Sequence, residues 1–205
     1  MFENFGPVIF FCTVIIGMLI LYESKKASGK KDAASRDYWD REARANSVRR
    51  KDITFLDYIS VEPDNLPFIE TDDIEILEYQ DTIRRLSSKK ILNLTNVSNT
   101  EIKEAYGVAN LDTLSDYDNN YTTLVNTIVK WGRRLIDLGY TKEATAVLEY
   151  GIQIKSDASR NYYMLADLYK KSGDTDKIDG LIEVASSLNS IMKEKIIAKL
   201  TDMKG

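Results

Sequence analysis

Two glycines that lie 34 residues apart, Gly139 and Gly173, constrain the fold of this chain more than any other feature. Each glycine separates two helix-like apolar stretches, and small residues, Gly132 and Ala166, fall at the same offset before the two glycines. Glycine adopts the left-handed backbone conformation that ends many helices, and small residues let two helices approach closely. The pattern therefore predicts two copies of one helical hairpin.

Further positions of the two copies correspond at the same offset from the glycines. The matched pairs are Leu135 with Tyr169, Ala144 with Ile178, Leu148 with Ile182 and Gly151 with Ala185. With this period and these small, aromatic and glycine positions, residues 125–158 and 159–192 resemble the tetratricopeptide repeat, a family of stacked helical hairpins. The departures from the family are Ile128 and Trp131 at its first-helix Trp and Leu positions, Ile178 for the usual Ala, and Ser156 and Ser190 for the closing Pro.

The segments that flank the repeats are expected to cap them, because repeat arrays of two units are rarely stable alone. Among 205 residues there are only three Pro, with 29% charged and 43% hydrophobic residues, which is typical of a helical globular protein. Residues 53–70 contain two prolines and are predicted to lie extended against the domain. The capping helices are expected from Thr71, from the capping box of Ser98 and Glu101, and over residues 190–203, with Ile191 on the apolar face.

An uncharged apolar run, residues 5–22, lies near the N-terminus. As a helix it would span about 27 Å, close to the hydrocarbon thickness of a bilayer. It lacks the basic flank and small-residue exit of a cleaved signal peptide, which is the alternative interpretation. The run is therefore predicted to be a retained transmembrane anchor, and the basic residues after it predict a single-pass cell-membrane location with the N-terminus outside and the C-terminal domain cytoplasmic.

Charge is segregated along the chain. Residues 23–51, the basic neck, hold ten basic and five acidic residues, a net charge of about +5, and residues 52–205 carry about −8. Contact with anionic lipid is expected for such a neck, and a merely solvated helix is the alternative. Within the neck, Ser35 is a good N-cap for a short helix, in which Tyr38 and Trp39 would rest at the lipid interface or pack on the domain.

These patterns predict a mostly α fold in which a transmembrane helix precedes a tetratricopeptide-like α-hairpin domain, an α-solenoid. The predicted parts are an anchor at 1–22, a basic juxtamembrane neck, partly helical, at 23–51, an extended segment with capping helices at 52–118, and the repeats with a C-terminal capping helix at 119–205.

Catalysis has little basis in this sequence. There is no His, and the single Cys is Cys12, which removes Ser-His-Asp and Cys-His mechanisms and His-containing zinc sites. Acidic pairs such as Asp72 with Asp73, or Asp116 with Asp118, lie in cap-like contexts. No enzyme activity, cofactor or metal is therefore predicted, and the acidic body argues against a nucleic-acid partner.

The resemblance implies a concave surface lined by the first helix of each hairpin. The partner-binding residues that it implies are Asn126, Arg133, Arg160, Tyr163, Asp167 and Lys170. The cations among them suit an acidic or C-terminal peptide of a protein partner. Two alternatives are that these are ordinary solvated charges, or that residues 53–68 of the chain itself fill the groove.

The predicted function is a membrane-anchored, non-enzymatic adaptor or scaffold whose cytosolic domain binds a protein partner. The alternative is a structural subunit of a membrane complex, or a homo-oligomer, without a peptide-binding groove.

Overall fold

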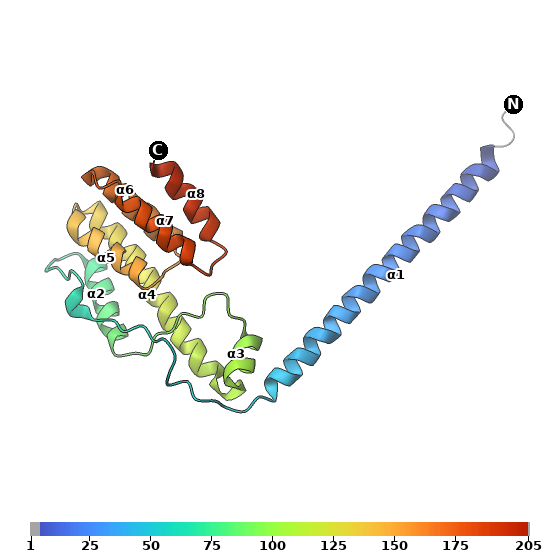
Figure 1. The fold of residues 1–205 in the computed structure, drawn as a ribbon, viewed down its shortest axis with the longest axis horizontal. Helices are drawn as coiled ribbons and strands as arrows, with labels where there is room; N and C mark the ends of the chain where they lie inside the picture. Colours follow the sequence, from blue (N-terminus) through green and yellow to red (C-terminus); the bar gives the residue numbers. More distant parts are fainter. Residues whose placement is uncertain (1–4, 205) are drawn as a thin grey trace.

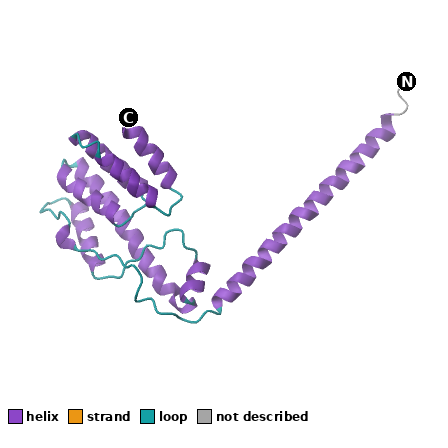
Figure 2. Cartoon of the chain, viewed as in Figure 1, coloured by secondary structure: helices purple, strands orange, loops and turns teal. Residues whose placement is uncertain are grey.

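The chain folds into a body of packed helices from which one long helix projects (Figure 1). The computed structural model describes the backbone of residues 5–204 and, within them, the side chains of residues 16–26 and 35–204. This described part is mostly helical and contains no strand (Figure 2). The helices are α1 (Phe5–Asn46), α2 (Ile74–Ser87), α3 (Asn99–Tyr106), α4 (Leu111–Asp137), α5 (Thr141–Gln153), α6 (Ser159–Ser172), α7 (Lys177–Ser187) and α8 (Lys193–Lys204), with 3-10 turns at Pro63–Asn65 and Val108–Asn110.

Helix α1 joins two predicted elements into one. The apolar run and the separate neck helix expected from Ser35 belong to a single continuous helix that ends at Asn46. The helix passes through Gly29, because one glycine costs a helix interior only about 1 kcal/mol. Ser35 is therefore an interior residue of α1 and not an N-cap.

The predicted single-pass membrane location is contradicted. No helix among the described residues has both the length and the apolar character needed to cross a bilayer. Residues 1–15 of the predicted anchor lie outside the described side chains.

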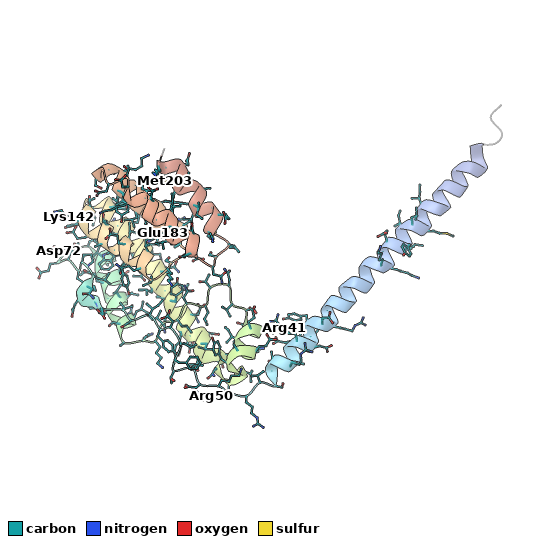
Figure 3. All side chains as sticks on the ribbon, viewed as in Figure 1. Arg41, Arg50, Asp72, Lys142, Glu183 and Met203 are labelled. Atoms are coloured by element: carbon teal, nitrogen blue, oxygen red, sulfur yellow. The ribbon has the colours of Figure 1, made fainter. Side chains whose placement is uncertain are left out.

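The C-terminal end of α1 is fastened to α3. Arg41 donates two hydrogen bonds to the Glu104 carboxylate, at 2.9 and 2.7 Å, and Lys103 pairs with Glu42. Ala45 is fully buried at this contact, which we call the α1–α3 clasp; Figure 3 labels Arg41 beside it. Tyr38, one turn further out, stays 55% exposed.

Tyr38 and Trp39 pack edge-to-face on each other, with ring centroids 5.3 Å apart. Trp39 is 64% exposed, so neither ring is buried against the body. Packing of these two rings on the domain, one of the two alternatives that the sequence left open, is therefore not observed.

The two turns of the predicted hairpins have the same geometry. Gly139 and Gly173 both have φ of 84°, in the left-handed region. The Tyr140 N–H donates to the Leu135 carbonyl at 2.9 Å, and the Asp174 N–H donates to the Tyr169 carbonyl at 2.8 Å, so both helices end with the same six-residue hydrogen bond. The prediction of two matching glycine turns is confirmed.

The serines at the family's closing-Pro positions also match. Ser156 Oγ accepts the Ala158 N–H, and Ser190 Oγ accepts the Met192 N–H, both at 3.1 Å. Each serine thus turns the chain toward its next helix by a local side-chain bond, which is a function that proline serves by fixing its backbone angle.

Small residues bring α4, α5 and α6 together. A Cβ atom added to Gly132 would lie 2.6 Å from the Leu148 side chain, and one added to Gly151 would lie 2.8 Å from the Asn161 amide. These positions leave no room for a side chain, as the sequence predicts for a close helical hairpin.

Residues 53–70 lie extended against the body. Phe68 packs on the buried Trp131, with ring centroids 5.4 Å apart, and Arg84 lies 4.7 Å over the Phe68 ring. The buried side chain of Gln80 in α2 forms two hydrogen bonds with the Ile69 backbone. It accepts one from the Ile69 N–H at 2.7 Å and donates one to the Ile69 carbonyl at 3.2 Å.

One predicted helix boundary agrees with the structure and two differ from it. Helix α3 has the predicted capping box of Ser98 and Glu101. Helix α4 runs unbroken through residue 118, where the domain boundary was expected. Helix α8 begins after Ile191, which is 88% exposed and not part of the apolar face.

Candidate partner-binding groove

Helices α4 and α6, each the first helix of a predicted hairpin, lie next to each other on one side of the body. Both pack on α5, from which each is separated by a short turn, and they also contact each other. Helix α2 packs along α4, and α8 packs along α6. The α4–α6 face is thus flanked by a helix on either side.

A groove of about 520 Å³ lies between α2, α4 and α6. Its lining residues are Glu75 and Tyr79 of α2, Val129, Lys130, Arg133, Arg134 and Asp137 of α4, and Arg160, Tyr163, Met164 and Asp167 of α6. The volume is in the range of sites that hold small molecules or peptide side chains.

Ion pairs fix two of the four cations of this groove. Arg134 donates to the Asp73 carboxylate at 2.6 and 3.1 Å and lies 3.9 Å from Glu75. Arg133 bonds to Asp137, one turn later on α4, at 3.0 Å. The Arg134 hydrogen bond, together with the Ile76 N–H, lowers the pKa of Asp73 below its usual value.

The other two cations are unpaired. Lys130 and Arg160 are exposed, and neither forms an ion pair with any residue whose side chain the structure describes. They are the groups of this groove most available to an anionic side chain or carboxylate.

The structure brings four of the six predicted site residues to the groove, namely Arg133, Arg160, Tyr163 and Asp167. Lys170 does not line it, because its ammonium group donates to the Met203 carbonyl of α8. Asn126 is exposed on α4, one turn before the lining residues. The Tyr163 hydroxyl donates to the Lys195 carbonyl at 3.3 Å, so the ring borders the groove while its polar tip is held by α8.

Sequence reasoning missed the contribution of α2. Glu75 and Tyr79 reach the groove through the ion pair of Asp73 with Arg134, across 61 residues of sequence. Nothing in the local pattern of α2 marks a neighbour at that distance. The groove also includes Lys130, which is adjacent to Val129 on α4 but was not among the residues predicted from the repeat pattern.

The groove is not filled by the extended segment. None of its lining residues comes from residues 53–68, whose Phe68 ring packs on Trp131 instead. Self-occupation by this segment is therefore not what the structure shows.

A second cleft, of about 590 Å³, lies where four loops meet at the other ends of the hairpins. Some of its polar side chains bond to one another or to the body. Asn93 donates to the Tyr121 hydroxyl at 2.9 Å, and Ser190 donates to Asp157 at 2.6 Å. Lys155 is the one cation among the residues that line this cleft, against four in the groove, so the groove is the stronger candidate for an anionic partner segment.

The acidic pairs named from the sequence have structural contacts. Asp73 caps α2 and holds Arg134, and Asp118 accepts the Leu94 N–H at 3.0 Å. Among the side chains that the structure describes, no group of three or more His, Cys, Asp or Glu is placed to hold a metal ion.

Comparison of the chain with family models, with curated proteins and with solved structures found no match in any of the three. The groove and its charges therefore stand as the basis for a functional proposal.

Proposed function

We propose that this chain is a non-enzymatic adaptor or scaffold whose helical body binds a segment of a protein partner in the groove between α2, α4 and α6. One observation carries the proposal. Two hairpins that share turn geometry place four of the six expected binding residues around one open groove.

The resemblance to the tetratricopeptide repeat supports this reading at residues 125–158 and 159–192. Gly139 and Gly173 share one conformation, and Ser156 and Ser190 form equivalent turns. Helical repeats of this kind expose a concave face to partners. Here α4 and α6 hold the positions of the first helices, and the groove lies on their shared face.

The lining suits a protein segment better than a small metabolite. Half-buried apolar side chains of Val129, Tyr163 and Met164 lie among charged groups at the rim. An apolar anchor surrounded by polar contacts is the usual composition of a protein-recognition site. Lys130 and Arg160 add attraction for acidic side chains or for a terminal carboxylate.

Quantitative affinity capture of the full chain tests the proposal. A Lys130→Glu, Arg160→Glu variant reverses both unpaired cations, and a Lys89→Glu, Lys142→Glu variant makes the same charge change at exposed sites outside the groove. Thermal melting and circular dichroism of both variants should match wild type, since none of the four residues is buried or ion-paired.

A partner that is recovered with wild type and with the control variant, and lost with the groove variant, is the expected result. Equal recovery with all three proteins would refute groove binding. Recovery of the chain alone as an oligomer, unaffected by the groove variant, would instead favour a structural role.

A further inference from the structure

Helix α2 borders a hollow on each of two sides. Glu75 and Tyr79 line the groove between α2, α4 and α6. Leu77, Gln80 and Arg84 line another hollow, of about 530 Å³. In an α-helix with 3.6 residues per turn, these two sets of side chains point to nearly opposite sides. This other hollow, which we call the outer α2 hollow, is therefore separate from the groove.

The other wall of the outer α2 hollow is the chain just before α2, which runs beside the helix in the opposite direction. Three contacts fix this arrangement. Arg84 lies 4.7 Å over the Phe68 ring, Gln80 bonds to the Ile69 backbone, and Asp73 caps the first turn of α2. The residues between Ile69 and Asp73 therefore lie beside the first turns of α2, and Arg84 lies at the other end of the hollow.

Two carboxylates at the first turns of α2 have no ion-pair partner. Glu70 and Asp72 line the hollow, and both side chains are exposed. Neither forms an ion pair with a side chain that the structure describes. Residues 70–81 hold six acidic residues and no basic one. The end of the hollow away from Arg84 is therefore negatively charged.

Two apolar side chains are exposed on the same turns of α2. Ile74 is 72% exposed, and Leu77, which lines the hollow, is 45% exposed. They are three residues apart, so they are neighbours on the helix surface. Apolar surface that adjoins a hollow and is rimmed by charged groups is typical of an interaction site.

We propose that the outer α2 hollow binds a protein segment in which a basic side chain adjoins an apolar one. The basic group forms charge-assisted hydrogen bonds with Glu70 and Asp72, and the apolar group rests on Ile74 and Leu77. This surface goes beyond the proposed function, because it is separate from the groove and prefers the opposite charge. A chain with both surfaces binds two segments of opposite charge, one on each side of α2.

Three short peptides test the proposal with the isotope-labelled full chain, by NMR titration. They carry Lys–Leu–Lys, Glu–Leu–Glu or Lys–Ser–Lys. Wild type should bind Lys–Leu–Lys about tenfold more tightly than Glu–Leu–Glu, as expected when two exposed ion pairs become repulsions. It should bind Lys–Ser–Lys about fivefold more weakly than Lys–Leu–Lys, because the apolar contact is lost. The amide signals of Glu70, Asp72 and Leu77 should shift, and those of Lys130 and Arg160 in the groove should not.

Charge-reversal variants provide the decisive comparison. A Glu70→Lys, Asp72→Lys variant should bind Glu–Leu–Glu about tenfold more tightly than Lys–Leu–Lys. The matched control, Asp116→Lys, Glu183→Lys, makes the same change of net charge at exposed sites that line neither the groove nor the outer α2 hollow, and it should keep the wild-type order; Figure 3 labels Asp72 and Glu183. All four residues are exposed, so folded proteins are expected and are checked by thermal melting.

Three results would overturn the inference. A reversed preference in the control variant as well would show that binding follows net charge and not this hollow. Equal binding of Lys–Leu–Lys and Lys–Ser–Lys would show that the apolar face has no part in recognition. No binding of Lys–Leu–Lys at millimolar concentration, or equal binding of the two Leu peptides to wild type, would exclude the site. The capture experiment above tests the groove separately, with its own variant.

Discussion

At the residue scale, removal of the hydroxyl group is expected to affect stability differently at two buried tyrosines. The Tyr162 side chain is fully buried, and its hydroxyl has no hydrogen-bond partner among the described residues. The Tyr169 hydroxyl donates to Glu149 at 2.8 Å. Removing an unsatisfied polar group relieves a desolvation cost, whereas removing a bonded one does not.

Tyr162→Phe should therefore leave the free energy of unfolding unchanged or raise it by up to about 1 kcal/mol, and Tyr169→Phe should lower it by about 1 kcal/mol. Urea unfolding of the two variants beside wild type measures the difference. An equal loss in both would show that the Tyr162 hydroxyl has a stabilising partner after all.

Ionisation of Tyr162 gives a second residue-scale prediction. Burial raises its pKa to about 12, above the usual value near 10. Because the folded-state pKa is the higher one, this phenol contributes stability that is complete below pH 10 and is lost as pH rises through 12. Between pH 9 and 12, the free energy of unfolding should fall less steeply with pH in Tyr162→Phe than in wild type. Identical slopes would contradict the raised pKa.

Much of what escaped prediction at this scale involves buried amides. The Asn161 amide donates to the Leu148 carbonyl at 2.8 Å, and Gln80 grips the Ile69 backbone. A sequence pattern places amides at the surface, since burial is favourable only with a partner. Those partners come from other elements, so the burial of these residues follows from the fold and not from their neighbours in sequence.

At the scale of elements, Gly151 and Gly180 test the close packing of the hairpins. A Cβ at Gly151 would meet the buried Asn161 amide at 2.8 Å, while a Cβ at Gly180 in α7 would meet nothing within 4 Å. Gly151→Ala should lower the free energy of unfolding by about 1–3 kcal/mol through overpacking. Gly180→Ala should raise it by up to about 1 kcal/mol through helix propensity.

Thermal or urea unfolding of both alanine variants checks this pair. Because the chemical change is the same, the difference between them isolates the contact of α5 with α6. A stabilising effect at both sites would mean that α5 and α6 are not closely packed at Gly151.

The α1–α3 clasp is expected to weaken in acid. Hydrogen bonds from Lys103 and Thr100 lower the pKa of Glu42, and the Arg41 hydrogen bond lowers that of Glu104. For carboxylates with lowered folded-state pKa values, the stabilisation is present above the unfolded value, near 4.3, and is lost as pH falls through the folded value. Acid should therefore release α1 from α3.

Amide hydrogen exchange at Lys51, whose N–H donates to the Tyr106 carbonyl at 3.0 Å, reports this release. Its protection should fall between pH 5 and 3 relative to amides in α4. In a Glu42→Gln, Glu104→Gln variant the protection should be low throughout and insensitive to pH. Protection in wild type that is unaffected by acid would contradict the proposed electrostatic clasp.

Local signals account for the elements that were predicted correctly. The glycine turns at Gly139 and Gly173 and the capping box at Ser98 depend on residues within a few positions. The continuity of α1 was missed because a polar residue that suits a helix end, such as Ser35, is also tolerated within a longer helix. Helix α4 likewise continues across the boundary that was expected at residue 118.

At the scale of the whole molecule, the arrangement separates a projecting helix from a body that carries the groove (Figure 1). The face of α4 and α6 could be predicted from a 34-residue period, because the period fixes which residues share a side. The flanking helix α2 could not, since it is joined to that face by Arg134 and Asp73, which are far apart in sequence. The sequence therefore predicted four of the residues that line the groove, but it did not predict that α2 lines the other side of the groove.

Site-specific photo-crosslinking tests most directly whether a partner occupies this groove. A benzophenone amino acid in place of Met164, in the groove, is compared with the same group in place of Lys142, at the exposed start of α5 (Figure 3). The chain is expressed in its own cells and irradiated, and adducts are identified by mass spectrometry. We predict one protein adduct from position 164 and none from position 142. No adduct at 164, or adducts only between copies of this chain, would contradict partner binding in the groove.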